Sequence, residues 1–213
     1  GDMCASNHVI FNQYTVKAWY GFASLMSTTL VRRQSMSNVQ IFMAINIVGG
    51  LVVLAGYAIG LSVYPENRLA LWGGVQGNWR LIFTLSMMLS TIGYLLFTSF
   101  AMVNFSTGSF EPGGFATARY INFLCLIFLV SASMWMPSTI VYVNTQSVIW
   151  WIISVMALWV TALSLAILFC MILGSPFGES GLYRQLAMGG LGYIAFHCLV
   201  FDAIIWIYMF ARR

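Results

Sequence analysis

Charge is the scarcest property of this 213-residue chain, because Asp, Glu, Lys and Arg together make up only 7% of its residues. A water-soluble domain carries about 25% charged residues, so the composition excludes a soluble globular fold. The few charges sum to +4 and are spread along the sequence rather than gathered in a basic patch. We therefore expect no nucleic-acid partner.

Sequence motifs for chemistry are also missing. The chain contains no phosphate-binding loop, no HExxH pair and no nucleophile elbow. Its four cysteines show no CxxC spacing, and three of them lie in apolar segments, where a thiol acts as a small apolar residue. We expect neither a structural disulfide nor a metal site. The single lysine, Lys17, lies outside the long apolar segments, which excludes a retinal-type Schiff base.

Long hydrophobic runs are what the chain has in abundance: 61% of its residues are hydrophobic and its mean hydropathy is +0.88. A membrane-spanning helix needs about 20 mostly apolar residues to cross about 30 Å of hydrocarbon. Five segments reach that length, namely Ile41–Ser62, Leu81–Val103, Tyr120–Val143, Val148–Leu173 and Leu186–Phe210. The runs are continuous rather than alternating, which predicts helices and not barrel strands. The expected fold class is an all-α, polytopic membrane helical bundle.

The N-terminal residues 1–38 have a different character. The stretch Val9–Val31 is apolar and rich in aromatic residues, but Asn12, Gln13 and Lys17 interrupt it. Such a mixture is typical of segments that lie in the headgroup region. We expect 1–38 to form an interfacial or partner-docking segment, with a sixth span over 9–31 as the alternative. Residues 39–213 are expected to form a single transmembrane bundle in contact with the lipid bilayer.

The two membrane surfaces differ in their aromatic residues more than in their charges. We call the surface that holds 1–38 side A and the opposite surface side B. The loop Pro65–Arg80 on side B is expected to be a partly structured, amphipathic excursion along the surface. Six of the eight tryptophans lie toward side B: Trp72, Trp79, Trp135, Trp150, Trp151 and Trp206. An aromatic belt explains such a distribution, and so would a side that docks lipid tails, a pigment or neighbouring subunits.

Asp202 is the only charged residue well inside an apolar segment. It lies roughly 6 Å from the middle of the fifth helix toward side B, at about 1.5 Å rise per residue. An ionised carboxylate at this depth costs several kcal/mol unless it is paired or near water. We expect Arg80, which starts the second helix on the same side, to be its partner. The functional interpretations are a proton-relay carboxylate or a cation site; the structural one is a salt-bridged or protonated carboxyl group.

His197 lies five residues before Asp202. At about 100° per residue, the two side chains of an α-helix would point about 140° apart, so we do not expect them to share a ligand. His197 could bind a metal, haem or pigment, although the other histidine, His8, lies outside the predicted bundle. The alternative is a neutral histidine that is hydrogen-bonded across the bundle. Arg119, at the start of the third helix, completes this group of polar residues.

Four glycines mark positions where helices are expected to pack closely. Gly56 and Gly60 form a GxxxG pair in the first span, and Gly189 and Gly190 are adjacent near the start of the fifth. Small residues let helix backbones approach each other in lipid. These glycines predict helix contacts, either within the chain or with partner chains.

Pro137 interrupts the third span and is followed by Ser138 and Thr139. Proline removes a backbone donor and clashes with the preceding turn, so a kink is expected, and the nearby hydroxyls can satisfy the freed carbonyls. A kinked, hydroxyl-lined helix could wall a small ligand cavity. The alternative is a proline that the helix merely tolerates.

Three classes of function remain. The expected one is a non-catalytic, structural or accessory subunit of a larger membrane complex, because intramembrane polar groups are few and the glycine and aromatic faces suit association with other subunits or with itself. The second is a small transporter, channel or receptor that uses Asp202, His197 and the Pro137 kink. The third, a membrane-embedded enzyme on an apolar substrate, is disfavoured because acid–base catalysis needs several positioned titratable groups. We expect bound lipids, with a pigment as a further option.

Overall fold

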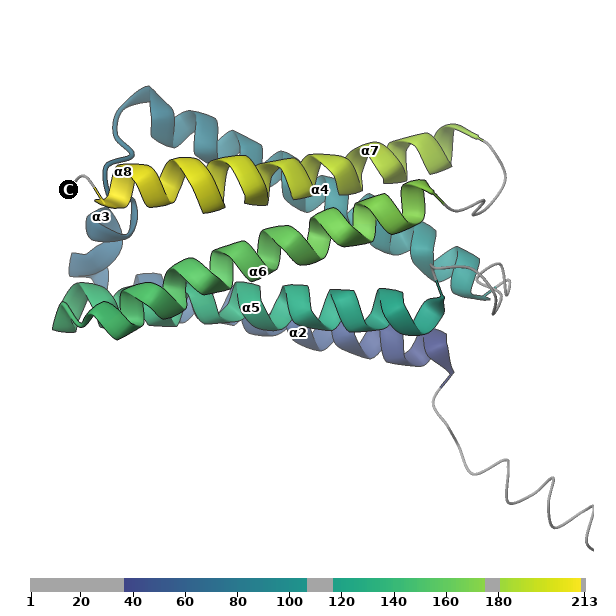
Figure 1. Ribbon diagram of the computed structural model, residues 1–213, viewed down its shortest axis with the longest axis horizontal. Coiled ribbons are helices and arrows are strands. Elements are labelled where there is room, and N and C mark those ends of the chain that lie inside the picture. Colours follow the sequence, from purple (N-terminus) through teal and green to yellow (C-terminus); the bar gives the residue numbers. More distant parts are fainter. Residues whose placement is uncertain (1–36, 107–116, 175–180, 212–213) are drawn as a thin grey trace, which may run out of the picture. The chain divides into compact units, whose positions relative to one another are not determined.

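The regular structure of the described residues is entirely helical. The computed structural model describes residues 37–106, 117–174 and 181–211. Five helices are long and apolar enough to cross a membrane, which confirms the predicted all-α, multi-pass membrane bundle (Figure 1). They are α2 (Asn38–Val63), α4 (Asn78–Ser106), α5 (Ala118–Thr145), α6 (Val148–Leu173) and α7 (Leu182–Phe196) with its continuation. The predicted N-terminal interfacial segment and the alternative span over 9–31 lie outside the described residues.

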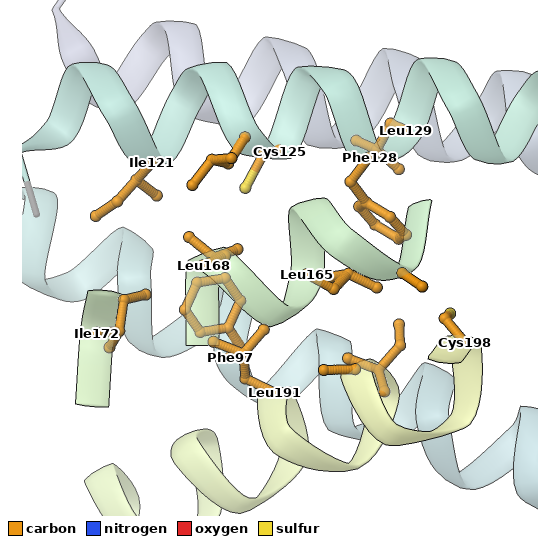
Figure 2. Close-up of a cluster of buried hydrophobic side chains, with 14 of the residues drawn as sticks. Phe97, Ile121, Cys125, Phe128, Leu129, Leu165, Leu168, Ile172, Leu191 and Cys198 are labelled. Carbon is orange, nitrogen blue, oxygen red and sulfur yellow. The ribbon is translucent and has the colours of Figure 1, made fainter. Parts of the chain in front are cut away.

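The third and fourth spans form an antiparallel hairpin. α5 ends at a left-handed residue, Gln146 (φ 54°), and α6 begins two residues later. Hydroxyl pairs join the two helices in their buried contact: Ser131 lies 2.8 Å from Thr161, and Thr139 lies 2.5 Å from Ser154. α6 runs between α5 and α7 (Figure 1), and its leucines fill the core between them (Figure 2).

α4 keeps one antiparallel register along the whole fifth span, that is, with α7 and with its continuation η2 (His197–Trp206). Successive contacts pair Phe83 with Phe201, Ser86 with His197, Gly93 with Gly190 and Phe100 with Tyr183. The residue numbers in these pairs add to nearly the same sum, as expected for two antiparallel helices that stay together. This register decides which α4 side chain lies opposite His197.

The closest approach of α4 and α7 is at a pair of glycines. A Cβ atom added to Gly190 would lie 2.5 Å from the carbonyl oxygen of Gly93, and one added to Gly93 would lie 2.6 Å from that of Gly190. Gly190 is therefore at a helix contact, and its partner Gly93 was not among the predicted glycines. Gly189 is not at this contact, because one residue of rotation turns it toward open space.

The contact of α2 with α5 uses small residues, but not the predicted GxxxG pair as a unit. A Cβ on Gly60 would lie 3.1 Å from Cγ of Met136, and one on Gly49 would lie 2.7 Å from Cδ1 of Leu129. Gly56 lies between these two contacts in sequence, and nothing approaches its Cβ position within 4 Å. Gly56 therefore makes no close helix contact within the described chain, and a contact of Gly56 with a partner chain stays a prediction.

The loop from Pro65 to Arg80 packs against the bundle instead of only following a surface. It contains two short helices, η1 (Pro65–Asn67) and α3 (Arg68–Leu71), as the expectation of partial structure required. Its Val75 and Leu71 side chains are buried, and the indole of Trp206 donates a 3.0 Å hydrogen bond to the Leu71 carbonyl. This loop therefore closes onto the helix that carries the candidate site.

Candidate functional site

The fifth span changes from α-helix to π-helix at the residues of interest. α7 ends at Phe196, η2 (His197–Trp206) is a π-helix, and α8 (Ile207–Ala211) resumes the α conformation. Backbone hydrogen bonds in a π-helix join residues five apart, so such residues lie one above the other. π-Helical turns are rare and are found frequently at functional sites.

This geometry brings His197 and Asp202 together. Nε2 of His197 lies 3.6 Å from Oδ1 of Asp202. The expectation that these side chains point about 140° apart was wrong, because it assumed α-helical rotation of about 100° per residue. A spacing of five residues separates two side chains in an α-helix and aligns them in a π-helix.

A hydroxyl on α4 extends the pair across the helix contact. Oγ of Ser86 lies 2.8 Å from Nδ1 of His197 and 2.9 Å from the hydroxyl of Tyr193. Each of these three groups can both donate and accept hydrogen bonds in a suitable tautomer. Tyr193, Ser86, His197 and Asp202 therefore form a continuous polar chain, which we call the relay.

The imidazole in the relay is held in place from several directions. His197 is buried, with 4% of its side chain exposed, and its ring stacks on Phe201 at a centroid distance of 5.3 Å. Phe201 in turn packs edge-on against Phe83 of α4. The ring has little freedom to turn away from Ser86 or Asp202.

Arg80 is not the partner of Asp202. Its Nε donates a 2.9 Å hydrogen bond to the carbonyl of Val75, so the guanidinium closes the end of its own loop. Asp202 is instead surrounded by weakly polar groups. The thiol of Cys198 is its hydrogen-bond neighbour, and the phenol of Tyr57 on α2 is near enough to interact with it electrostatically. The Asp202 side chain is 30% exposed, against 4% for that of His197, so Asp202 is the less enclosed member of the pair.

The side chains around Pro137 fill a helix contact. α5 continues through the proline, and Ser138 donates to the Met134 carbonyl at 2.7 Å, as expected for a hydroxyl that satisfies freed backbone groups. Thr139 donates to the Trp135 carbonyl and also meets α6. Ser138 and Thr139 are 1% and 0% exposed. These two hydroxyls are turned to backbone and to the neighbouring helix and not to a cavity, which favours the alternative of a proline that the helix tolerates.

Trp206 is buried in the bundle, and Trp135 and Trp151 are half-buried against the same core. Trp206 packs edge-on against Trp135 at 5.4 Å and near Trp151 at 6.0 Å. Trp151 in turn stacks on Phe210 at 4.9 Å. Trp79, in contrast, is 48% exposed, as an interfacial residue would be.

Two members of the relay, Ser86 and Tyr193, were missed in the sequence. Serine in a membrane helix commonly donates to its own backbone, as Ser90 does to the Ser86 carbonyl at 2.8 Å. Ser86 lies seven residues from Gly93, and His197 lies seven residues from Gly190. Once the contact of the two glycines was known, this equal spacing could have indicated that Ser86 lies opposite His197.

Among the residues in the described ranges, no group of three or more His, Cys, Asp or Glu side chains could hold a metal ion. The chain was also compared with protein-family models, curated protein sequences and solved structures, and none of them matches. The geometry of the relay is therefore the basis for assigning a function.

Proposed function

We propose that this multi-pass membrane protein is a proton-coupled transporter or receptor in which the His197–Asp202 pair takes up and releases a proton. The observation that carries this proposal is the polar chain Tyr193–Ser86–His197–Asp202, built at membrane depth on a π-helix. Ionisable residues inside a membrane are costly and mark proton relays and ion pathways.

The charge of the pair favours a proton over a larger ligand. His197 and Asp202 together are neutral when they share one titratable proton, whichever residue carries it, and have a charge of −1 when they release it. Among the described residues, Tyr57 and Cys198 also interact with Asp202, and neither supplies a positive charge at neutral pH. Apolar surroundings favour the neutral form of the pair. The pair therefore keeps its proton until a partner or ligand changes these surroundings.

The polar contacts of the relay, the 3.6 Å His197–Asp202 ion pair and the two hydrogen bonds of Ser86, also supply a route. When Asp202 gives a proton to Nε2 of His197, the opposite nitrogen can pass its own proton to the Ser86 hydroxyl. Ser86 then passes its hydroxyl proton toward Tyr193. The Tyr193 oxygen accepts the Ser86 proton as its own hydroxyl proton passes to a water molecule beyond the relay. One proton thus enters at Asp202, one leaves at Tyr193, and no charge accumulates on the imidazole.

Removal of the Ser86 hydroxyl is expected to break this route. In proteoliposomes that contain a trapped pH-sensitive dye, a potassium diffusion potential set by valinomycin should drive proton uptake by the unmodified protein. Ser86→Ala should reduce the uptake to the rate of protein-free liposomes. Ser90→Ala is the matched control, because Ser90 is equally buried on the same helix but bonds only to backbone. Equal rates for the two variants would contradict the proposed route.

A structural or accessory subunit is the second candidate, and the exposure of α2 favours it. Along its most apolar stretch α2 is 6% buried in the bundle, whereas the corresponding stretches of the other four spans are 28–44% buried. Its Ile47 and Leu54 side chains are 56% and 66% exposed. A partner helix, from a second copy or another membrane protein, would cover this face.

Association through α2 is expected to survive extraction in a mild detergent. Native mass spectrometry should then record the chain together with at least one further polypeptide, and Leu54→Arg should reduce the assembly to a single chain. Observation of only the 23.7 kDa chain with bound lipid, before any substitution, would contradict the subunit role.

A further inference from the structure

An apolar groove lies between α2 and α5, away from the relay. It has a volume of about 380 Å³ and is lined by Ala44, Val48 and Val52 of α2 and by Leu126, Val130 and Ser133 of α5, among others. The hydroxyl of Ser133 donates a 2.7 Å hydrogen bond to the carbonyl of Val130. The groove therefore offers a ligand no free hydroxyl, and its lining suits a hydrocarbon chain.

The position of the groove along α2 places it in the side A half of the membrane. Ala44 is six residues and Val52 fourteen residues from the first residue of α2 at side A. At about 1.5 Å per residue, the groove extends from roughly 9 Å to roughly 21 Å along the helix. This is the depth range of an acyl chain that belongs to the side A leaflet.

A basic side chain lies at the side A mouth of the groove. Arg119 precedes Leu126 by seven residues, which is about two turns of α-helix, so both lie on the same face of α5 and about 10 Å apart. Arg119 is exposed. Next to it, the side-chain amide of Asn122 donates to the carbonyl of Asn38, which ties the start of α2 to α5 at 3.2 Å. The mouth of the groove is thus fixed where the headgroup of a lipid would lie.

We propose that the groove holds an acyl chain of an anionic phospholipid from the side A leaflet, whose phosphate is bound by Arg119. An arginine fork matches the geometry of a phosphate. A headgroup with net negative charge gains from a nearby guanidinium, whereas a choline headgroup carries a cation that offsets the gain. The lipid is a bound component of the bundle and is independent of the relay.

The proposal predicts separate effects for the two ends of the site. The purified full chain is incorporated into nanodiscs that contain equal amounts of phosphatidylglycerol and phosphatidylcholine, and native mass spectrometry counts the lipids retained after release. The unmodified chain should retain phosphatidylglycerol preferentially. Arg119→Gln should lower that preference about fivefold, which corresponds to about 1 kcal/mol for one basic residue near a membrane surface. Arg68→Gln, on side B, should leave it unchanged.

The apolar end is tested by filling the groove. Ala44→Phe should reduce the retained phosphatidylglycerol to the level of the bulk lipid. Ala55→Phe is the matched control, because Ala55 is an exposed alanine of the same helix and is not among the groove residues. Ala44→Leu serves in its place if the phenylalanine variant does not fold. Equal retention of the two lipids by the unmodified chain, or an unchanged preference in the Ala44 variants, would overturn the proposal.

Discussion

Replacement of Gly190 by alanine is expected to lower the free energy of unfolding by about 2–3 kcal/mol, the cost of overpacking a tight contact. The added methyl group would lie 2.5 Å from the Gly93 carbonyl oxygen and 2.7 Å from the Gly93 Cα. Both atoms belong to backbone, so no side chain can turn aside, and α4 and α7 must separate. The same separation would pull Ser86 away from His197 two turns further along the contact.

The neighbouring glycine supplies the control for this prediction. Nothing lies within 4 Å of the Cβ position of Gly189, so Gly189→Ala should leave stability unchanged or raise it by up to about 1 kcal/mol through better helix propensity. Unfolding in mixed micelles with increasing fractions of a denaturing detergent, followed by tryptophan fluorescence, measures both variants. Equal stability of the two alanine variants would contradict the close approach of α4 and α7.

Asp202→Asn is expected to abolish proton uptake while the fold is retained. Asparagine has nearly the same shape as aspartate and keeps an acceptor oxygen, but it cannot take up and release a proton near pH 7. In the proteoliposome assay its rate should fall to that of protein-free liposomes. Its far-ultraviolet circular dichroism and its elution in size-exclusion chromatography should match those of the unmodified chain.

Two further variants show whether Asp202 acts with His197 or alone. His197→Gln should remove uptake as fully as Asp202→Asn, and the double variant should be no worse than either single one, because residues that act as one unit are not additive. Glu66→Gln removes a carboxylate from the loop outside the spans and should have no effect. Residual uptake in His197→Gln equal to that of the unmodified chain would show that the imidazole is not part of the route.

The spans could be predicted from the sequence because the length and polarity of a membrane helix are imposed by the bilayer. Four of the predicted apolar runs each lie within one observed helix, and the fifth, Leu186–Phe210, runs through α7, η2 and α8. The closure of the Pro65–Arg80 loop could not be predicted, because it depends on long-range contacts such as the hydrogen bond from Trp206 to Leu71.

The candidate site was only half predictable. Asp202 and His197 stand out because charged and imidazole groups are rare in apolar runs, but their proximity depends on a π-helix. The π-helix is rare and the continuous apolar run does not mark where it begins, so the sequence favoured the commoner α geometry and the wrong angle. Arg80 was predicted to pair with Asp202 only because both residues lie toward side B of the membrane. In the structure Arg80 instead donates to the carbonyl of Val75, which belongs to the same loop as Arg80.

The central claim is that Asp202 exchanges a proton in contact with His197 inside the membrane. Infrared difference spectroscopy of the reconstituted protein between two pH values tests it most directly. We predict a carboxyl band that is lost in Asp202→Asn and shifted in His197→Gln. A carboxyl band that persists in Asp202→Asn, or one that is identical with and without the imidazole, would contradict the claim.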